Sequence, residues 1–186
     1  MTRIVAGLAK GRRLVVPERG TRPTSERARE ALFNTLRTHL DIGGANVLDL
    51  FAGTGAVGLE ALSRGAGRVV FVERDRTAAA LLQRNIDAVG LPGTRVHRRA
   101  VTAVLDDPAG NRFDLVFADP PYELPDDQLG DILTALVTGD WLVPDAMVVV
   151  ERSARGNELA WPPGIVLVTH RRYGEGQLWY GRANHG

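Results

Sequence analysis

Short β-prone runs alternate with helical segments from residue 46 onward, and this alternation restricts the fold more than any other feature of the chain. Strands linked through helices run parallel in one sheet, with helices packed on its faces. The predicted strands are 46–52, 68–73, 94–100, 113–118 and 146–151. The predicted helices are 57–65, 76–90 and 129–136. Two further β-prone runs flank Gly174-Glu175-Gly176, so we expect a mostly parallel, doubly wound α/β sheet with an antiparallel edge hairpin.

Length and composition limit the expected domain size, the cellular compartment and the kinds of site. The chain of 186 residues is long enough for one domain with a sizeable core, and no apolar run approaches the length that spans a membrane. The N-terminus lacks the apolar stretch of a signal peptide, so the cytoplasm is the expected compartment. We also expect a monomer. The chain has no cysteine, and its four histidines are scattered, so we expect no metal site.

Positive charge is concentrated near the N-terminus. Residues 1–37 hold nine Arg or Lys against three Glu, although the formal net charge of the whole chain is only +1. The β-prone runs 3–6 and 12–16 flank a glycine-bounded turn, and Thr24 or Ser25 is expected to cap a helix behind them. Clustered basic residues indicate a polyanionic partner. We therefore expect residues 1–38 to form an RNA-contacting extension of a cofactor-binding domain, 39–186, with contacts from Arg3, Lys10, Arg12 and Arg13.

A glycine-rich turn follows the first strand of the alternating region. The sequence DLFAGTGAVGLEA contains Gly53, Gly55 and Gly58 in the spacing G-x-G-x-x-G, which on its own is also compatible with a dinucleotide site. Asp49 precedes these glycines, and Glu73 closes the next strand. A carboxylate at Glu73 suits a ribose diol and one at Asp49 suits an amino group, which together match S-adenosylmethionine. A turn cap at Asp49 and a helix cap at Glu73 are the structural alternatives.

The fourth strand of this region ends abruptly in Asp119-Pro120-Pro121-Tyr122. Two prolines stop the strand and hold the adjacent groups rigidly. An exocyclic amine on a nucleobase is a poor nucleophile because its lone pair is delocalised into the ring. We expect the Asp119 carboxylate and the Pro120 carbonyl to accept its two N–H groups, while Tyr122 stacks on the base. A strand-ending turn with a buried tyrosine is the alternative.

Several segments together resemble one family. The motifs DLFAGTG and DPPY resemble those of class I S-adenosylmethionine-dependent amino-methyltransferases, which have a Rossmann-like fold. RIVAGLAKGRRL, TRPTSERAREALFNTL, DLFAGTGAVGLEALSRGA and YGEGQLWYG resemble the RsmD family over nearly the whole chain. This resemblance implies methylation of guanine N2 in bacterial 16S ribosomal RNA, alone or in the small subunit, with S-adenosylhomocysteine as the product.

The resemblance also implies roles for particular positions. Asp49, Phe51, Gly53 and Gly55 would hold the methionine half of the cofactor, and Glu73 with Arg74 would hold the ribose. The main chain at Ala100 and Val101 would contact the adenine, without the acid that many methyltransferases carry there. Arg22 and Thr24 would belong to a loop that covers the cofactor.

Two other functions remain compatible with these motifs. An amino-methyltransferase acting on DNA or on a protein side chain would share DPPY, but few residues outside the sheet domain are left for a target-recognition domain. A non-catalytic RNA-binding assembly factor would share the fold, but it would not need Asp49, Glu73 and the complete DPPY turn.

Overall fold

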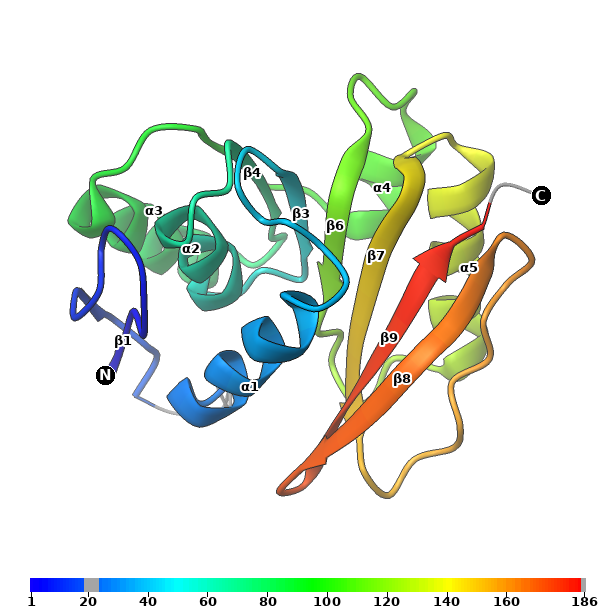
Figure 1. Ribbon diagram of the computed structural model, residues 1–186. Helices are drawn as coiled ribbons and strands as arrows, with labels where there is room; N and C mark the ends of the chain where they lie inside the picture. Colours follow the sequence, from blue (N-terminus) through cyan, green and yellow to red (C-terminus); the bar gives the residue numbers. More distant parts are fainter. Residues whose placement is uncertain (19–23, 185–186) are drawn as a thin grey trace.

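In the computed structural model, which describes residues 1–18 and 24–184, seven strands form one sheet in the order β5-β4-β3-β6-β7-β9-β8 (Figure 1). The strands are β3 (Asn46–Leu50), β4 (Arg68–Val72), β5 (Thr94–His97), β6 (Phe113–Ala118), β7 (Leu142–Ser153), β8 (Ile165–Tyr173) and β9 (Gly176–Ala183). In the sheet, the neighbours β5, β4, β3, β6 and β7 pair in parallel, and β9 pairs antiparallel with β7 and β8. The predicted doubly wound sheet with an antiparallel edge hairpin is confirmed.

Helices cover both faces of this sheet, as Figure 1 shows. The helices are α1 (Glu26–Leu36), α2 (Ala56–Ser63), α3 (Arg76–Val89), α4 (Val101–Asp106) and α5 (Asp126–Thr138). Alternate strand residues point to opposite faces. Val47 and Phe117 therefore join the apolar cluster under α1, α2 and α3, whereas Leu48 and Val116 join the cluster under α4 and α5. Across the described part of the chain, no helix combines the length and apolarity that membrane crossing requires.

Side-chain caps define where α1 and α3 begin, whereas α5 follows Pro125 without a side-chain cap. The Ser25 hydroxyl accepts a hydrogen bond from the Ala28 N–H at 3.1 Å and starts α1, as the sequence predicts for Thr24 or Ser25. The Asp75 carboxylate accepts from the Ala78 N–H at 2.7 Å and starts α3. Each cap satisfies one of the backbone donors that a helix leaves unpaired in its first turn. The chain then leaves α3 through Gly90, at a φ of 68°.

Several predicted boundaries differ from the structure, and two of the differences concern β5 and β7. The predicted strand 94–100 ends at His97, and the short helix α4 follows it directly. Six residues are too few for an apolar periodicity to be recognised, so this helix has no clear sequence signal. Strand β7 begins at Leu142 rather than at 146, and the register irregularity in its pairing with β6 lies where Asp145 takes a φ of 64°.

The N-terminal hairpin pairs over a shorter length than the sequence predicts, because its backbone bonds to α2 instead. Strands β1 (Thr2–Arg3) and β2 (Arg13–Leu14) pair at two residues each. The fully buried Glu60 carboxylate accepts from the N–H groups of Val5 at 2.8 Å and Ala6 at 3.1 Å. A carboxylate that accepts two backbone N–H groups is held firmly in place. The hairpin is therefore docked on the helix that follows the glycine-rich turn.

A second contact joins the hairpin to the glycine-rich turn itself. The buried Asn85 side chain on α3 accepts from the Val15 N–H at 2.7 Å and donates to the Val15 carbonyl at 2.9 Å. The same amide donates to the Thr54 carbonyl at 2.9 Å. Ile4 and Leu14 also belong to the apolar cluster under α1, α2 and α3. The N-terminal segment therefore supports the turn that the sequence assigns to the cofactor.

Gly7 provides a test of this docking. It has a φ of 88°, and an added Cβ would lie 1.9 Å from the Ser63 carbonyl oxygen on α2. Gly11 has a similar φ of 84°, but no atom lies within 4 Å of an added Cβ. Gly11→Ala should therefore cost only the backbone strain, about 1–2 kcal/mol. Gly7→Ala should lower the free energy of unfolding by clearly more, measured by urea denaturation. Equal losses for the two variants would contradict the docking of the hairpin on α2.

Candidate active site

The two sequence motifs meet because β3 and β6 are neighbours in the sheet. These strands pair in parallel, with Asp49 opposite Phe117 and Leu50 opposite Ala118. The glycine-rich turn leaves the sheet after Leu50, and the Asp119–Tyr122 turn leaves it after Ala118. Both turns therefore emerge from the same edge of the sheet, at the point where the strand order reverses direction. Ligands of open α/β sheets bind at this position.

Asp49 is a buried acid at this edge, with only 2% of its surface exposed. Its Oδ2 accepts from the Gly58 N–H at 3.0 Å, in the first turn of α2. Burial raises the pKa of Asp49 well above its usual range, although the Gly58 hydrogen bond opposes this and the charge of Glu73 adds to it. The capping interaction expected as the structural alternative is therefore present. Because the buried charge is unfavourable, a cationic group beside Asp49 would be bound strongly.

Glu73 holds the glycine-rich turn rather than capping the next helix. Its Oε2 accepts from the Gly53 N–H at 2.7 Å, and its Oε1 accepts from the Asp75 N–H at 2.8 Å. The N-cap of α3 is Asp75, so the helix-cap alternative for Glu73 is not what the structure shows. A carboxylate has about four lone-pair sites, and Glu73 keeps acceptor capacity beyond these two bonds.

The backbone of the turn has left-handed φ angles at three positions, 55° at Phe51, 56° at Gly53 and 82° at Gly55. An added Cβ at Gly55 would lie 2.2 Å from Leu82, whereas at Gly53 it would meet no atom within 4 Å. Gly55 is therefore required by packing, and Gly53 leaves open space on the side away from the core. Phe51 is the strained residue, since bulky side chains rarely adopt this region.

The DPPY turn presents a carboxyl group and an aromatic ring. Pro120 is buried, Asp119 is partly buried, and the Tyr122 residue is 53% exposed, so the buried tyrosine of the alternative interpretation is not found. Burial raises the pKa of Asp119 well above its usual range. The negative charges of Glu151 and Asp49 raise it further, and Arg152 opposes them. A carboxyl with a raised pKa is suited to accepting a proton near neutral pH.

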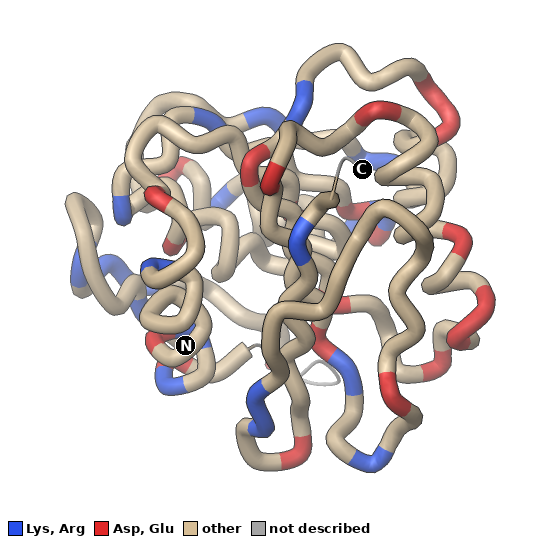
Figure 2. The backbone as a smooth tube through the Cα atoms, turned by 45° about the vertical axis from the view of Figure 1, so that its right-hand side comes forward, with Lys and Arg blue, Asp and Glu red and all other residues tan. Residues whose placement is uncertain are grey.

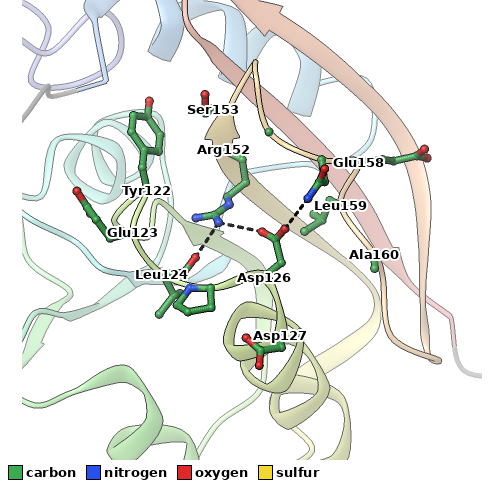
Figure 3. Close-up of a pocket in the computed structure, with 14 residues that line it drawn as sticks. Tyr122, Glu123, Leu124, Asp126, Asp127, Arg152, Ser153, Glu158, Leu159 and Ala160 are labelled. Atoms are coloured by element: carbon green, nitrogen blue, oxygen red, sulfur yellow. Dashed lines mark hydrogen bonds and ion pairs between the residues drawn. The ribbon is translucent and has the colours of Figure 1, made fainter.

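Arg152 fixes the loop that follows this turn (Figure 3). Its guanidinium donates to the Pro121 carbonyl at 3.2 Å, to the Leu124 carbonyl at 2.9 Å and to the Asp126 carboxylate at 3.0 Å. Asn157 also donates to Asp126, at 3.2 Å. These bonds form one wall of a cavity of about 650 Å³ that Tyr122 also lines. The sequence did not indicate Arg152, because its contacts join segments about 30 residues apart.

The other predicted cofactor residues belong to separate segments of the chain. Ala100 is the N-cap of α4, and Val101 is buried in its first turn, directly after β5. Arg74 is exposed beside Glu73. The Thr24 hydroxyl donates to the Glu151 carboxylate at 3.2 Å, which brings the segment before α1 to the strand beside DPPY. Arg22 lies outside the described residues.

The predicted RNA-binding residues form a separate exposed group on the hairpin. Arg3, Lys10, Arg12 and Arg13 are all exposed, and Arg12 donates to the Ala88 carbonyl at the end of α3 at 3.1 Å. Arg3 and Lys10 line a hollow of about 450 Å³ together with Arg27 and two acids of α1. Figure 2 shows many acidic positions on the side of the molecule away from the N-terminus, and some beside the N-terminus as well. Residues 1–16 themselves contain no acid, but Glu26 and Glu30 of α1 lie beside Arg3 and Lys10.

Comparison with known sequences gives one family for this chain. The model of the family described as conserved hypothetical protein 95 matches residues 2–182. Ribosomal RNA small subunit methyltransferase D of Escherichia coli strain K12 is 36% identical over 179 residues, covering 96% of this chain and 87% of the relative. A Bacillus subtilis protein named putative rRNA methyltransferase YlbH is 35% identical, and the match covers 91% of each chain.

Solved structures agree with these sequence relatives. A putative methyltransferase, yhhF, from Escherichia coli superimposes with a TM-score of 0.87 at 30% identity, covering 100% of this chain and 99% of that one. A putative methylase from Haemophilus influenzae gives a TM-score of 0.81 at 31% identity, covering 99% of both chains. The match therefore includes the N-terminal hairpin and the closing strands as well as the central sheet.

Neutralising Asp119 should stabilise the fold. Because the pKa of Asp119 is raised in the folded state, this carboxyl favours folding below its unfolded pKa near 4, and that contribution is lost as the pH rises through the raised value. Asp119→Asn should therefore raise the melting temperature at pH 7–8 by about 2 °C or more, with no gain at pH 4. The exposed Glu158→Gln removes the same charge as a control and should leave the melting temperature unchanged. An unaltered melting temperature for Asp119→Asn at pH 8 would contradict the raised pKa of this carboxyl.

Proposed function

The chain belongs to the conserved hypothetical protein 95 family, and we propose that it transfers a methyl group from S-adenosylmethionine to the exocyclic N2 amine of a guanine in small-subunit ribosomal RNA. The chain is a methyltransferase, and the resemblance to the RsmD family is confirmed. The observation that carries the proposal is the pairing of β3 with β6, which sets the glycine-rich turn beside Asp119-Pro120-Pro121-Tyr122. The relatives named as ribosomal RNA methyltransferases support the substrate class.

The residues at the glycine-rich turn fit S-adenosylmethionine. Asp49 is a buried carboxylate suited to an α-amino group, and Glu73 has acceptor capacity for a ribose diol. Gly53 leaves space where a Cβ would otherwise project toward a ligand. Ala100 is the N-cap of α4 and Val101 its first residue, where backbone N–H groups have no acceptor within the helix and would suit an adenine ring nitrogen. S-adenosylmethionine, when bound, supplies a methyl group made electrophilic by a sulfonium.

Asp119 and its neighbours would prepare the acceptor amine. The Asp119 carboxylate accepts one N–H of the amine and the Pro120 carbonyl accepts the other, which favours a pyramidal nitrogen with an exposed lone pair. The exposed Tyr122 ring stacks on the base. Asp119 would take the proton released by the amine as the new N–C bond forms, and the electron pair of the broken S–C bond would stay with the donor's sulfur. The raised pKa of Asp119 supports its role in taking the proton.

Residues 1–38 would bind the RNA backbone while residues 39–186 carry out the transfer. Arg3, Lys10, Arg12 and Arg13 are exposed on the hairpin, where phosphates could reach them. The bonds from Glu60 and Asn85 hold the hairpin against the cofactor-binding turn. Phosphate contacts on such a fixed element would set the position of the RNA relative to Asp119. We propose that the protein performs this reaction as a monomer and without a metal ion.

Ribosomal RNA from a strain lacking this protein provides the direct test. Nucleoside mass analysis should show one N2-methylguanosine missing, and the purified protein with S-adenosylmethionine should restore it to isolated small subunits or 16S RNA. Asp119→Ala should reduce this methylation about 10²- to 10³-fold, because it removes a preorganised acceptor in the transition state. Calorimetry should show cofactor affinity within a few-fold of wild type for this variant.

Glu73→Ala is the matched control for that variant. It should weaken cofactor binding about tenfold or more, because a charged acceptor is removed, and leave RNA affinity unchanged. Ribosomal RNA with its full set of N2-methylguanosines in the deletion strain would overturn the proposed acceptor. Wild-type turnover by Asp119→Ala would overturn the role of Asp119.

The salt dependence of RNA binding tests the hairpin. Lys10→Gln with Arg13→Gln removes two exposed charges without deleting the backbone that bonds to α2. The slope of log affinity against log salt should become shallower by roughly 0.7–0.9 for each phosphate that the variant no longer binds. Arg112→Gln with Arg155→Gln removes the same charge from other exposed positions and should leave the slope unchanged. Equal slopes for the two double variants would contradict RNA binding by the hairpin.

A further inference from the structure

Glu151 is a second acid beside the DPPY turn, and neither motif includes it. Strands β6 and β7 pair in parallel, with Phe117 opposite Val149 and Ala118 opposite Val150. Asp119 and Glu151 are each the next residue, on strands whose neighbours lie about 4.8 Å apart. Phe117 and Val149 both point into the cluster under α1, so the alternation of side chains places Asp119 and Glu151 on that same face. The Glu151 charge acts directly on Asp119.

Within residues 1–18 and 24–184, the surroundings of Glu151 leave its charge only partly compensated. The residue is partly buried, and its Oε2 accepts a hydrogen bond from the Thr24 hydroxyl at 3.2 Å. Burial raises the pKa of Glu151, and the Thr24 hydrogen bond only opposes this effect. The adjacent Arg152 is committed to Asp126 and to two backbone carbonyls. A buried carboxylate in this state favours a ligand that brings further hydrogen-bond donors.

Two neighbouring carboxylates match the edge of guanine and of no other common base. In guanine the ring N1–H stands next to the exocyclic amine, so that edge presents donors side by side. In adenine and cytosine the ring nitrogen next to the amine is an acceptor with a lone pair. A carboxylate facing that lone pair would be repelled and would lose its partner. Unpaired charges of this kind are an effective means of rejecting a wrong substrate.

We propose that Glu151 restricts methylation to guanine by accepting the ring N1–H while Asp119 accepts the neighbouring N2–H. This inference rests on the proposed function, because it assigns Glu151 to the same acceptor site. It adds the residue that distinguishes a guanine enzyme from an adenine or cytosine enzyme with the same DPPY turn. The other role available to Glu151 is a tether that holds the segment before α1 through Thr24.

A substrate with an altered base edge separates these roles. 2-Aminopurine keeps the exocyclic 2-amine but has an acceptor at N1 in place of the N1–H, and it also lacks the 6-carbonyl oxygen, whose loss is the same for both proteins compared. Small subunits would be reconstituted around 16S RNA with either guanosine or 2-aminopurine riboside at the mapped position. Methylation rates for both would be measured with the wild-type protein and with Glu151→Gln. The Gln amide keeps the size of Glu151, accepts from a guanine N1–H or donates to the N1 lone pair, and removes the buried charge.

The wild type should methylate guanosine at least about 100-fold faster than 2-aminopurine. Glu151→Gln should be about 10- to 100-fold slower on guanosine, because a charged hydrogen bond is removed, and should not be slower on 2-aminopurine. The preference, which is the rate on guanosine divided by the rate on 2-aminopurine, should therefore be at least about tenfold lower in Glu151→Gln than in the wild type. Intrinsic differences in reactivity between the two amines cancel when the preferences of the two proteins are compared.

Thr24→Val is the control for the tether. It removes the hydroxyl that bonds to Glu151 but keeps the carboxylate, so it should retain the wild-type preference even where both rates fall. An unchanged preference in Glu151→Gln would overturn the inference, as would a Thr24→Val variant whose preference falls equally. Failure of the wild type to methylate guanosine would instead overturn the proposed function, so the two failures are distinguishable.

Discussion

The proposed active site depends on the parallel pairing of β3 with β6, two strands that are separated in the sequence by β4, β5 and three helices. Asp49 and Asp119 are distant along the chain, and the register of this pair alone places both at one edge of the sheet. The sheet is buried on both faces, and a slip of one residue would send every side chain to the other face. The apolar clusters therefore specify the register strongly, and this register sets the relative positions of the proposed cofactor and acceptor sites.

The N-terminal segment is an integral part of this arrangement, although its composition suggests a separate arm. Glu60 and Asn85 bind its backbone, and Asn85 also binds the glycine-rich turn at Thr54. The Thr24 side chain then connects the segment to Glu151, on the strand beside DPPY. The segment thus contacts structural elements on both sides of the site. RNA contacts on the hairpin would be transmitted through hydrogen-bonded, buried groups rather than through a flexible linker.

The fold and both motifs could be predicted from the sequence because their signals are local. Alternating strands and helices, the glycines and the double proline each act within a few residues. Helix α4 was missed because its six residues carry no measurable periodicity. Glu151 and Arg152 were missed for a different reason. In the sequence, each is a charged residue at or next to the end of a predicted strand. The structure adds the pairing of β7 with β6, the contact of Glu151 with Thr24, and the contacts of Arg152 with Pro121 and Leu124.

Asp49, Asp119 and Glu151 lie on adjacent strands β3, β6 and β7 or at their ends, and the pKa of each is raised. Keeping like charges together destabilises the folded state, so the arrangement calls for ligands that relieve it. A cation held at Asp49 would lower the pKa of Asp119, because the two acids interact electrostatically. Methyl transfer would remove the sulfonium charge while the amino group held at Asp49 stays cationic. The loss of that one positive charge would raise the pKa of Asp119 as the amine releases its proton, and the negative charge of Glu151 would act in the same direction.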